Sequence, residues 1–191
     1  DPKVEKRARW MSYATYAACA VFLLVLAGAW FASYIGNRDL IASVHLDSGI
    51  YNQQITELQK RGAQDADLAA VIQPLNTLRL MRGGYEERDQ SIPISLTFGL
   101  YQGEKLGNAA SDSYFRALNG LLLPRLIARV EAQVVQRLNQ PEFLYQVLKV
   151  YLVLGRKGPL DAELVMQWLD ADLLATYPSE EQTPVREMLL A

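Results

Sequence analysis

Residues 92–107 contain the residue types from which phosphate-binding loops are built. Apolar residues alternate as in a strand up to Phe98, and a glycine-rich turn with Lys105 follows. In phosphate-binding loops the backbone amides surround the phosphate, and a lysine and a hydroxyl complete the site. Here Glu104 falls where the lysine should be, and Lys105 is followed by Leu106 rather than by a hydroxyl residue. A carboxylate in this place repels an anion. Pro93 also weakens the strand. We therefore expect no cofactor at this stretch.

The glycines of this stretch are better explained by packing. Gly99, Gly103 and Gly107 are spaced four residues apart, so on a helix they would form one flat face for close approach of another backbone. Three glycines inside a helix cost roughly 3 kcal/mol of helix propensity. Part of the stretch is therefore either helix or a turn into the next helix, and both interpretations remain open.

Other chemically active residues are few. Cys19 and His45 are the single cysteine and the single histidine, which leaves neither an internal disulfide nor a zinc site. Acidic residues gather at 86–89, at Asp170 with Asp172, and at 180–181, where we interpret them as solvated surface or as acids at helix starts. The sequence thus predicts no catalytic residue, no metal site and no enzyme.

An uncharged segment of 28 residues lies between Arg9 and Arg38. As a helix, 23 of these residues span about 35 Å, which exceeds a hydrocarbon core of about 30 Å. Aromatic residues flank it as membrane-interface belts do, with Trp10 and Tyr13 at one end and Trp30 and Tyr34 at the other. A buried helix of a soluble domain is usually shorter, and a cleaved signal peptide has a shorter apolar run. We predict a transmembrane helix, with Arg9 at its inner interface.

The charges beside this segment predict its orientation. Four basic residues precede it, at positions 3, 6, 7 and 9, whereas Arg38 is the only one that follows before Lys60. The positive-inside rule places the N-terminus in the cytoplasm and the remainder in the periplasm of a Gram-negative cell. With a net charge of −2 the chain has no basic surplus for nucleic acid.

The remaining residues have helical periodicity. An apolar stripe from Leu40 to Leu58 predicts a stalk helix, kinked by glycines, with Tyr51 and Ile55 exposed for contacts. A helix follows at about 68–78, capped by Asp65 or Asp67 and bent or restarted at Pro74. Further helices are expected at about 104–119, 121–138, 141–154 and 160–177.

We predict a mainly α fold, with one transmembrane helix followed by a helical periplasmic domain. The expected parts are a cytoplasmic basic flank (1–9), the transmembrane helix (10–36), the periplasmic stalk helix (37–62) and the helical domain (63–191). The start without methionine and the apolar end suggest a fragment of a longer chain.

Several elements, taken together, resemble the IcmF/TssM family of type VI secretion systems. The resemblance covers nearly the whole chain. It includes a Trp-x-x-Ser-Tyr-x-x-Asn element after the membrane segment and a Leu-Tyr pair that begins an "LK-Y-L" helix. The residues that carry the other family elements or packing roles are Gly99, Leu100, Tyr101, Gln102, Gly103, Tyr114, Leu123, Pro124, Tyr145 and Tyr151.

This resemblance implies a structural inner-membrane component that anchors a trans-envelope secretion complex and forms its periplasmic scaffold by oligomerisation. It also implies a TssL-like inner-membrane partner and a TssJ-like outer-membrane lipoprotein, bound mostly outside this chain, besides the lipid bilayer. A nucleotide-binding-like domain would lie upstream, so its activity is not assigned to these residues. The alternative is a single-span receptor that binds a small ligand among its periplasmic helices.

Overall fold

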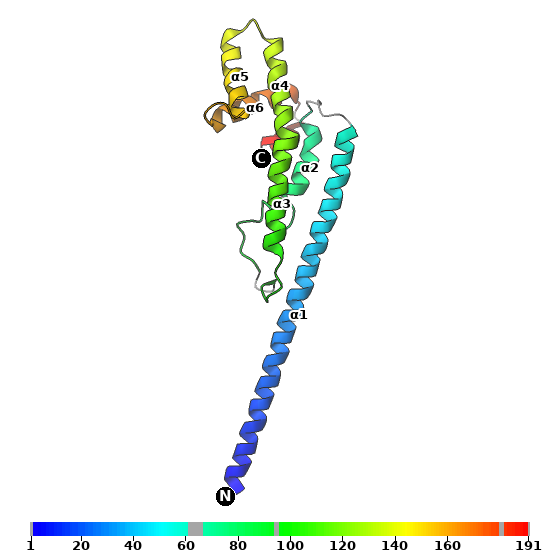
Figure 1. Ribbon diagram of the computed structural model, residues 1–191, viewed down its shortest axis with the longest axis vertical. Coiled ribbons are helices and arrows are strands. Elements are labelled where there is room, and N and C mark those ends of the chain that lie inside the picture. Colours follow the sequence, from blue (N-terminus) through cyan, green and yellow to red (C-terminus); the bar gives the residue numbers. More distant parts are fainter. Residues whose placement is uncertain (1, 61–66, 94–95, 180–181, 191) are drawn as a thin grey trace.

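The computed structural model describes residues 2–60, 67–93, 96–179 and 182–190, and the predicted mainly α-helical class is confirmed. The first helix, α1 (Pro2–Lys60), runs for 59 residues without a break at Gly36 or Gly49. Its N-terminal part projects alone from the rest of the molecule (Figure 1). The segment is long and apolar enough to cross a membrane, and only 6% of its most apolar window is buried.

The C-terminal half of α1 packs against a helical domain. Helix α2 (Ala69–Arg79) returns antiparallel to α1. Helix α3 (Gly103–Ala117) then runs in the same direction as α1 and packs against both α1 and α2 (Figure 1). Pro74 lies inside α2 and is buried, and α2 continues through it, so the helix is not restarted there. Asp67 accepts a hydrogen bond from the Ala69 amide at 2.9 Å, whereas the other predicted cap, Asp65, lies outside the described residues.

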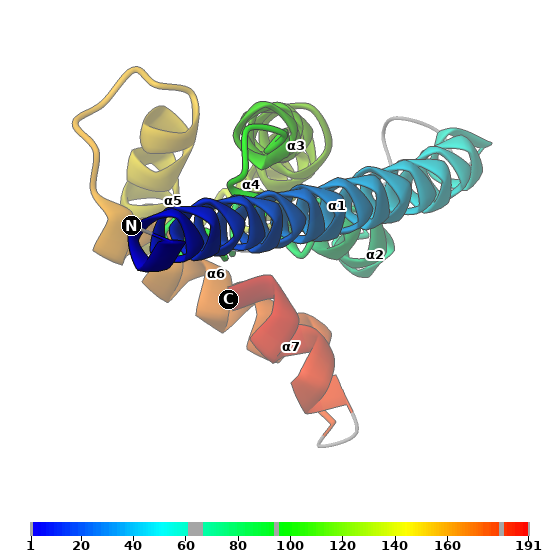
Figure 2. The same cartoon turned by 90° about the horizontal axis from the view of Figure 1, so that it is seen from below.

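The two helices expected on either side of residue 120 form one continuous rod. A π-helical turn, η2 (Leu118–Leu122), joins α3 to α4 (Leu123–Gln136). Seen from below, α3 and α4 lie one behind the other (Figure 2). Pro124 explains the turn, because its ring would clash with the carbonyl four residues earlier in a regular α-helix. The wider π turn accommodates this proline, so the predicted break is wrong.

Three shorter helices complete the domain. They are α5 (Pro141–Leu154), α6 (Ala162–Thr176) and α7 (Thr183–Leu190). The turn after α5 adopts positive φ at Arg156, at 56°, rather than at Gly155. Asp161 caps α6, since its Oδ1 accepts a hydrogen bond from the Leu164 amide at 2.9 Å.

Two of the sequence expectations about exposure are wrong. Tyr51 and Ile55 are not free contact residues, because they pack on the core cluster formed by α1, α2 and α3. Asp172 is not solvated surface: it is buried, whereas Asp170 is exposed. In both cases the partner lies on another helix, which local periodicity does not reveal.

Asp172 belongs to a polar network between α4 and α6. Its Oδ2 accepts a hydrogen bond from Arg129 Nε at 2.6 Å, and its Oδ1 accepts another from Gln133. Trp168 Nε1 donates to Gln133 Oε1 at 3.0 Å. Burial of a carboxylate is costly unless it is paired, and here the Arg129 guanidinium pairs with Asp172 and hydrogen bonds occupy both of its oxygens.

Candidate membrane-interface site

One face of α1 turns polar where the apolar segment ends. Ser33 and Asn37 are one helical turn apart and are buried, at 0% and 4% exposure. Leu40 is buried a further turn along, so this face is covered by another part of the chain. The covering segment is the loop that precedes α3.

Ser33 and Asn37 bind this loop through hydrogen bonds to its backbone. The Leu96 carbonyl accepts from Ser33 Oγ at 3.0 Å and from Asn37 Nδ2 at 3.2 Å. The Gln102 amide donates to Asn37 Oδ1 at 3.1 Å. One asparagine therefore satisfies a backbone carbonyl and a backbone amide that are six residues apart in the loop. We call these four residues, Ser33, Asn37, Leu96 and Gln102, the clasp.

Gly36 allows the loop to pack closely against α1. A methyl group added at Gly36 would overlap the side chain of Leu96, so this glycine permits the close approach. Beyond Leu96 the chain reverses, and Gly99 adopts φ of +80°, a left-handed conformation that other residues rarely take. Its amide donates back to the Thr97 carbonyl at 2.5 Å.

The three glycines of the loop and α3 have different surroundings. Gly99 lies in the turn, and Gly103 begins α3 beside the ring of Tyr101. Gly107 lies inside α3 against the backbone of Gly83, whose carbonyl oxygen occupies the space that a side chain would need. The open choice between helix and turn is thus resolved as a turn at Gly99 and helix from Gly103 onward.

The predicted interface residues lie on the exposed part of α1. Arg9, Trp10 and Tyr13 are exposed near its N-terminal end. Trp30 and Tyr34 are exposed next to the clasp, and their rings stack with centroids 6.5 Å apart. The clasp therefore lies beside the aromatic residues that the sequence predicts for the second membrane interface.

The other family-motif residues lie within the domain. Leu100 and Tyr101 are half-buried in the loop, and Tyr114 packs on Tyr85 with ring centroids 5.0 Å apart. Burial of the Tyr114 hydroxyl raises its pKa. Leu123 and the exposed Pro124 begin α4.

The two remaining tyrosines lie on α5, not at the clasp. Tyr145 carries Lys149 Nζ above its ring at 4.4 Å. Tyr151 donates to Glu131 Oε1 on α4 at 3.2 Å. Their contacts are with α5 itself and with its neighbour, so they have no part in holding the loop.

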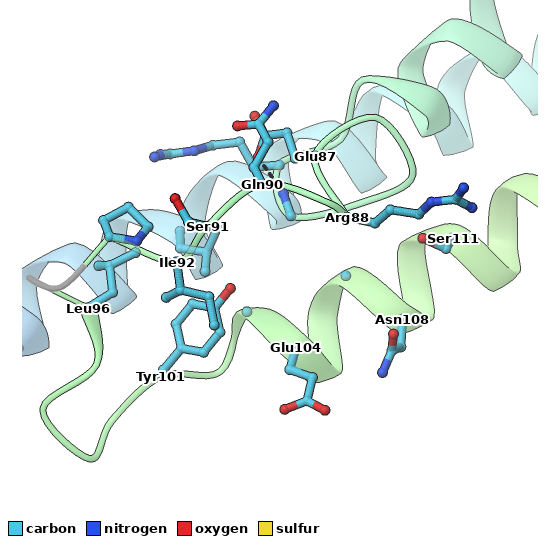
Figure 3. Close-up of a pocket in the computed structure, with 16 residues that line it drawn as sticks. Glu87, Arg88, Gln90, Ser91, Ile92, Leu96, Tyr101, Glu104, Asn108 and Ser111 are labelled. Atoms are coloured by element: carbon cyan, nitrogen blue, oxygen red, sulfur yellow. Dashed lines mark hydrogen bonds between the residues drawn. The ribbon is translucent and has the colours of Figure 1, made fainter.

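A hollow of about 410 Å³ lies between residues 82–93 and the first half of α3. Arg88, Glu87 and Glu104 are among its lining residues, and the Tyr101 side chain points towards Ile92 (Figure 3). Glu87 Oε2 already accepts a hydrogen bond from the Gly83 amide at 2.8 Å. Among the described residues, no group of three or more metal-ligating side chains occurs.

Sequence reasoning did not name Ser33 or Asn37 as site residues, although both belong to the Trp-x-x-Ser-Tyr-x-x-Asn element. The signal was available, because two polar side chains four residues apart share a face of an otherwise apolar helix. Such side chains need hydrogen-bond partners when buried. Their hydrogen-bond partner could not be predicted from the sequence, because it is the backbone of a loop some 60 residues away.

Fold and site together define a helical protein with an exposed apolar helix of membrane-spanning length, tied to its domain by a polar clasp. Residues 72–191 match the model of a family described as "IcmF-related: Intracellular multiplication and human macrophage-killing". The chain belongs to this family. It is also 30% identical over 196 residues to the "Type VI secretion system component TssM1" of Pseudomonas aeruginosa strain PAO1.

That match covers 100% of the present chain but only 16% of the relative's length. No solved structure gives a significant match to the chain. The similarity to a type VI secretion component therefore concerns about a sixth of that protein.

Proposed function

We propose that this chain is a structural anchor of a trans-envelope secretion complex. In this proposal α1 crosses the bacterial inner membrane once through residues 10–36, with residues 1–9 in the cytoplasm. The stalk (37–62) and the helical domain (63–191) lie in the periplasm and contribute to an oligomeric channel wall.

One observation carries the proposal: the apolar stretch of α1 is exposed. Large apolar side chains such as Phe22, Leu24 and Trp30 are 62%, 72% and 55% exposed. A soluble protein rarely leaves such a continuous apolar surface uncovered, whereas a bilayer covers it. Four basic residues before the segment favour a cytoplasmic N-terminus.

The family supplies the expected partners. Copies of the same chain, a TssL-like inner-membrane protein and a TssJ-like outer-membrane lipoprotein are proposed, the last contacting parts of the natural protein mostly outside this chain. The proposal assigns neither a catalytic role nor a cofactor to the described residues.

Topology and assembly are tested separately. Alkaline phosphatase fused after residue 191 becomes active only outside the cytoplasm, and a cytoplasmic reporter placed before residue 10 provides the opposite control. Active phosphatase with a cytoplasmic N-terminus is the expected result. The reverse pattern would show that α1 is inserted the other way.

Assembly is measured on the full-length natural protein, extracted in mild detergent alone and with its TssL-like and TssJ-like partners. Light scattering gives the copy number and cryo-electron microscopy the packing. We expect several copies with residues 40–177 against neighbouring copies. A monomer under every condition contradicts the scaffold, and a monomer with a small molecule held among its helices favours the receptor alternative.

A further inference from the structure

The loop that precedes α3 lies beside the apolar part of α1, well beyond the clasp. Phe98, at its tip, borders a shallow depression on α1 together with Leu26, Ala27 and Trp30. In Figure 1 this loop extends along α1 towards the projecting helix. The domain thus reaches past its own clasp along the helix that we propose to span the membrane.

We propose that residues 96–100 form a second membrane contact, in which Phe98 inserts into the outer leaflet beside α1. This inference rests on the proposed function, because it requires α1 to lie in lipid. The occupant of the surface around Phe98 is then the acyl chains of the leaflet on the C-terminal side of the span.

The depth of Phe98 follows from its neighbours on α1. Leu26 and Ala27 lie ten and nine residues before Gly36, the end of the proposed span, or roughly 14–15 Å into the membrane at 1.5 Å per residue. The interfacial layer on each side of a bilayer is only about 5–8 Å thick. Phe98 therefore reaches the acyl chains, while the clasp remains in the interfacial layer.

The composition of the loop agrees with this depth. From Gln90 to Gly103 the sequence contains no charged residue, whereas Asp89 and Glu104 flank it directly. Phe98 is 42% exposed, so a large part of its ring has no cover from this chain. An uncharged run with an exposed aromatic tip is suited to insertion at a membrane surface.

Hydrogen bonds at the base of the loop lower the cost of placing its backbone beside a membrane. Irregular backbone is tolerated at membrane depth only where its polar groups are bonded within the protein. The Leu96 carbonyl accepts from both Ser33 and Asn37, the Gln102 amide donates to Asn37, and the Gly99 amide donates to Thr97. The clasp thus provides hydrogen bonds that water supplies to an ordinary surface loop.

The test uses the full-length natural protein, reconstituted in phosphatidylcholine vesicles from a background without other cysteines. Phe98→Cys, or Thr97→Cys if that variant folds poorly, is labelled with a fluorophore and exposed to lipids that carry a nitroxide quencher on an acyl chain. Ala27→Cys on α1 is the membrane control. Leu160→Cys, 88% exposed on the domain, is the aqueous control.

We expect quenching at positions 98 and 27 and none at position 160. A second measurement uses protein without the fluorophore in vesicles without the nitroxide lipid. There a membrane-impermeant maleimide should react with Cys at position 98 at least about tenfold more slowly than at position 160, because an apolar environment disfavours the thiolate. If position 27 is quenched while position 98 is unquenched and reacts as fast as position 160, the lipid contact of Phe98 is refuted. The proposed membrane crossing of α1 is then still supported.

Two other outcomes also decide the question. If position 27 is itself unquenched, α1 does not lie in lipid and the proposed function fails first. If position 98 is unquenched in vesicles and becomes protected only when a partner membrane protein is added, a protein covers Phe98 and the lipid contact is refuted.

Discussion

Gly107 gives the sharpest test of how α3 is held, because replacement by alanine has two opposing effects. In an open helix, Gly→Ala stabilises by about 0.5–1 kcal/mol, since alanine loses less backbone entropy on folding. At Gly107 the added methyl group would overlap the Gly83 carbonyl oxygen and come within 3.0 Å of the Gly83 carbonyl carbon. Both atoms are backbone, so no side chain can move aside.

The Gly83 backbone is itself constrained. Its φ is +70°, and its amide donates to Glu87 Oε2 at 2.8 Å. Overpacking of this kind costs roughly 1–3 kcal/mol. Because both clashing atoms are backbone, a cost in the upper part of this range, about 2–3 kcal/mol, applies. Set against a gain of about 1 kcal/mol in propensity, Gly107→Ala should lower the free energy of unfolding by about 1–2 kcal/mol.

The matched control is Gly49→Ala, an exposed position in α1 where an added Cβ meets no atom within 4 Å. It should stabilise by about 0.5–1 kcal/mol. At about 2–4 °C per kcal/mol, Gly107→Ala should unfold roughly 2–8 °C below the parent, and Gly49→Ala slightly above it. Circular dichroism of the detergent-solubilised chain measures both. If Gly107→Ala were as stable as Gly49→Ala, the close approach of α3 to Gly83 would be refuted.

Three further predictions concern buried polar groups. Asp172→Ala removes the buried carboxylate that pairs with the Arg129 guanidinium and should destabilise by about 3 kcal/mol in denaturant titrations, whereas the exposed Asp170→Ala should change stability by less than about 0.5 kcal/mol; equal effects would contradict the network. Asn37→Ala removes the amide from the clasp and should cost about 1–3 kcal/mol and speed hydrogen exchange in residues 96–102, unlike Asn52→Ala on exposed α1; unchanged exchange would refute the clasp. Burial of the Tyr177 hydroxyl, with Asp67 beside it, raises the pKa of Tyr177, so its contribution to stability is complete below about pH 10 and is lost as the pH rises further. Tyr177→Phe should make that alkaline decline shallower, and an identical decline would show that this hydroxyl does not contribute.

The sequence by itself determined the helical class and the apolar segment. Helical periodicity predicted a helix at about 160–177, where α6 lies, and the uncharged residues 10–37 predicted a helix of membrane-spanning length. These features are local: each depends on residues within a few turns of one another. The family resemblance could be stated for the same reason, since short motifs in a fixed order carry it.

Tertiary structure decided the contacts between distant segments. Only the fold brings Asn37 to the backbone of Leu96 and Gln102, Gly107 to Gly83, and Asp172 to Arg129. Polarity alone made Asp170 and Asp172 equivalent, although one faces solvent and the other faces α4. The packing that buries one side chain of such a pair arises from helices far apart in the chain, and spacing along the sequence does not contain that information.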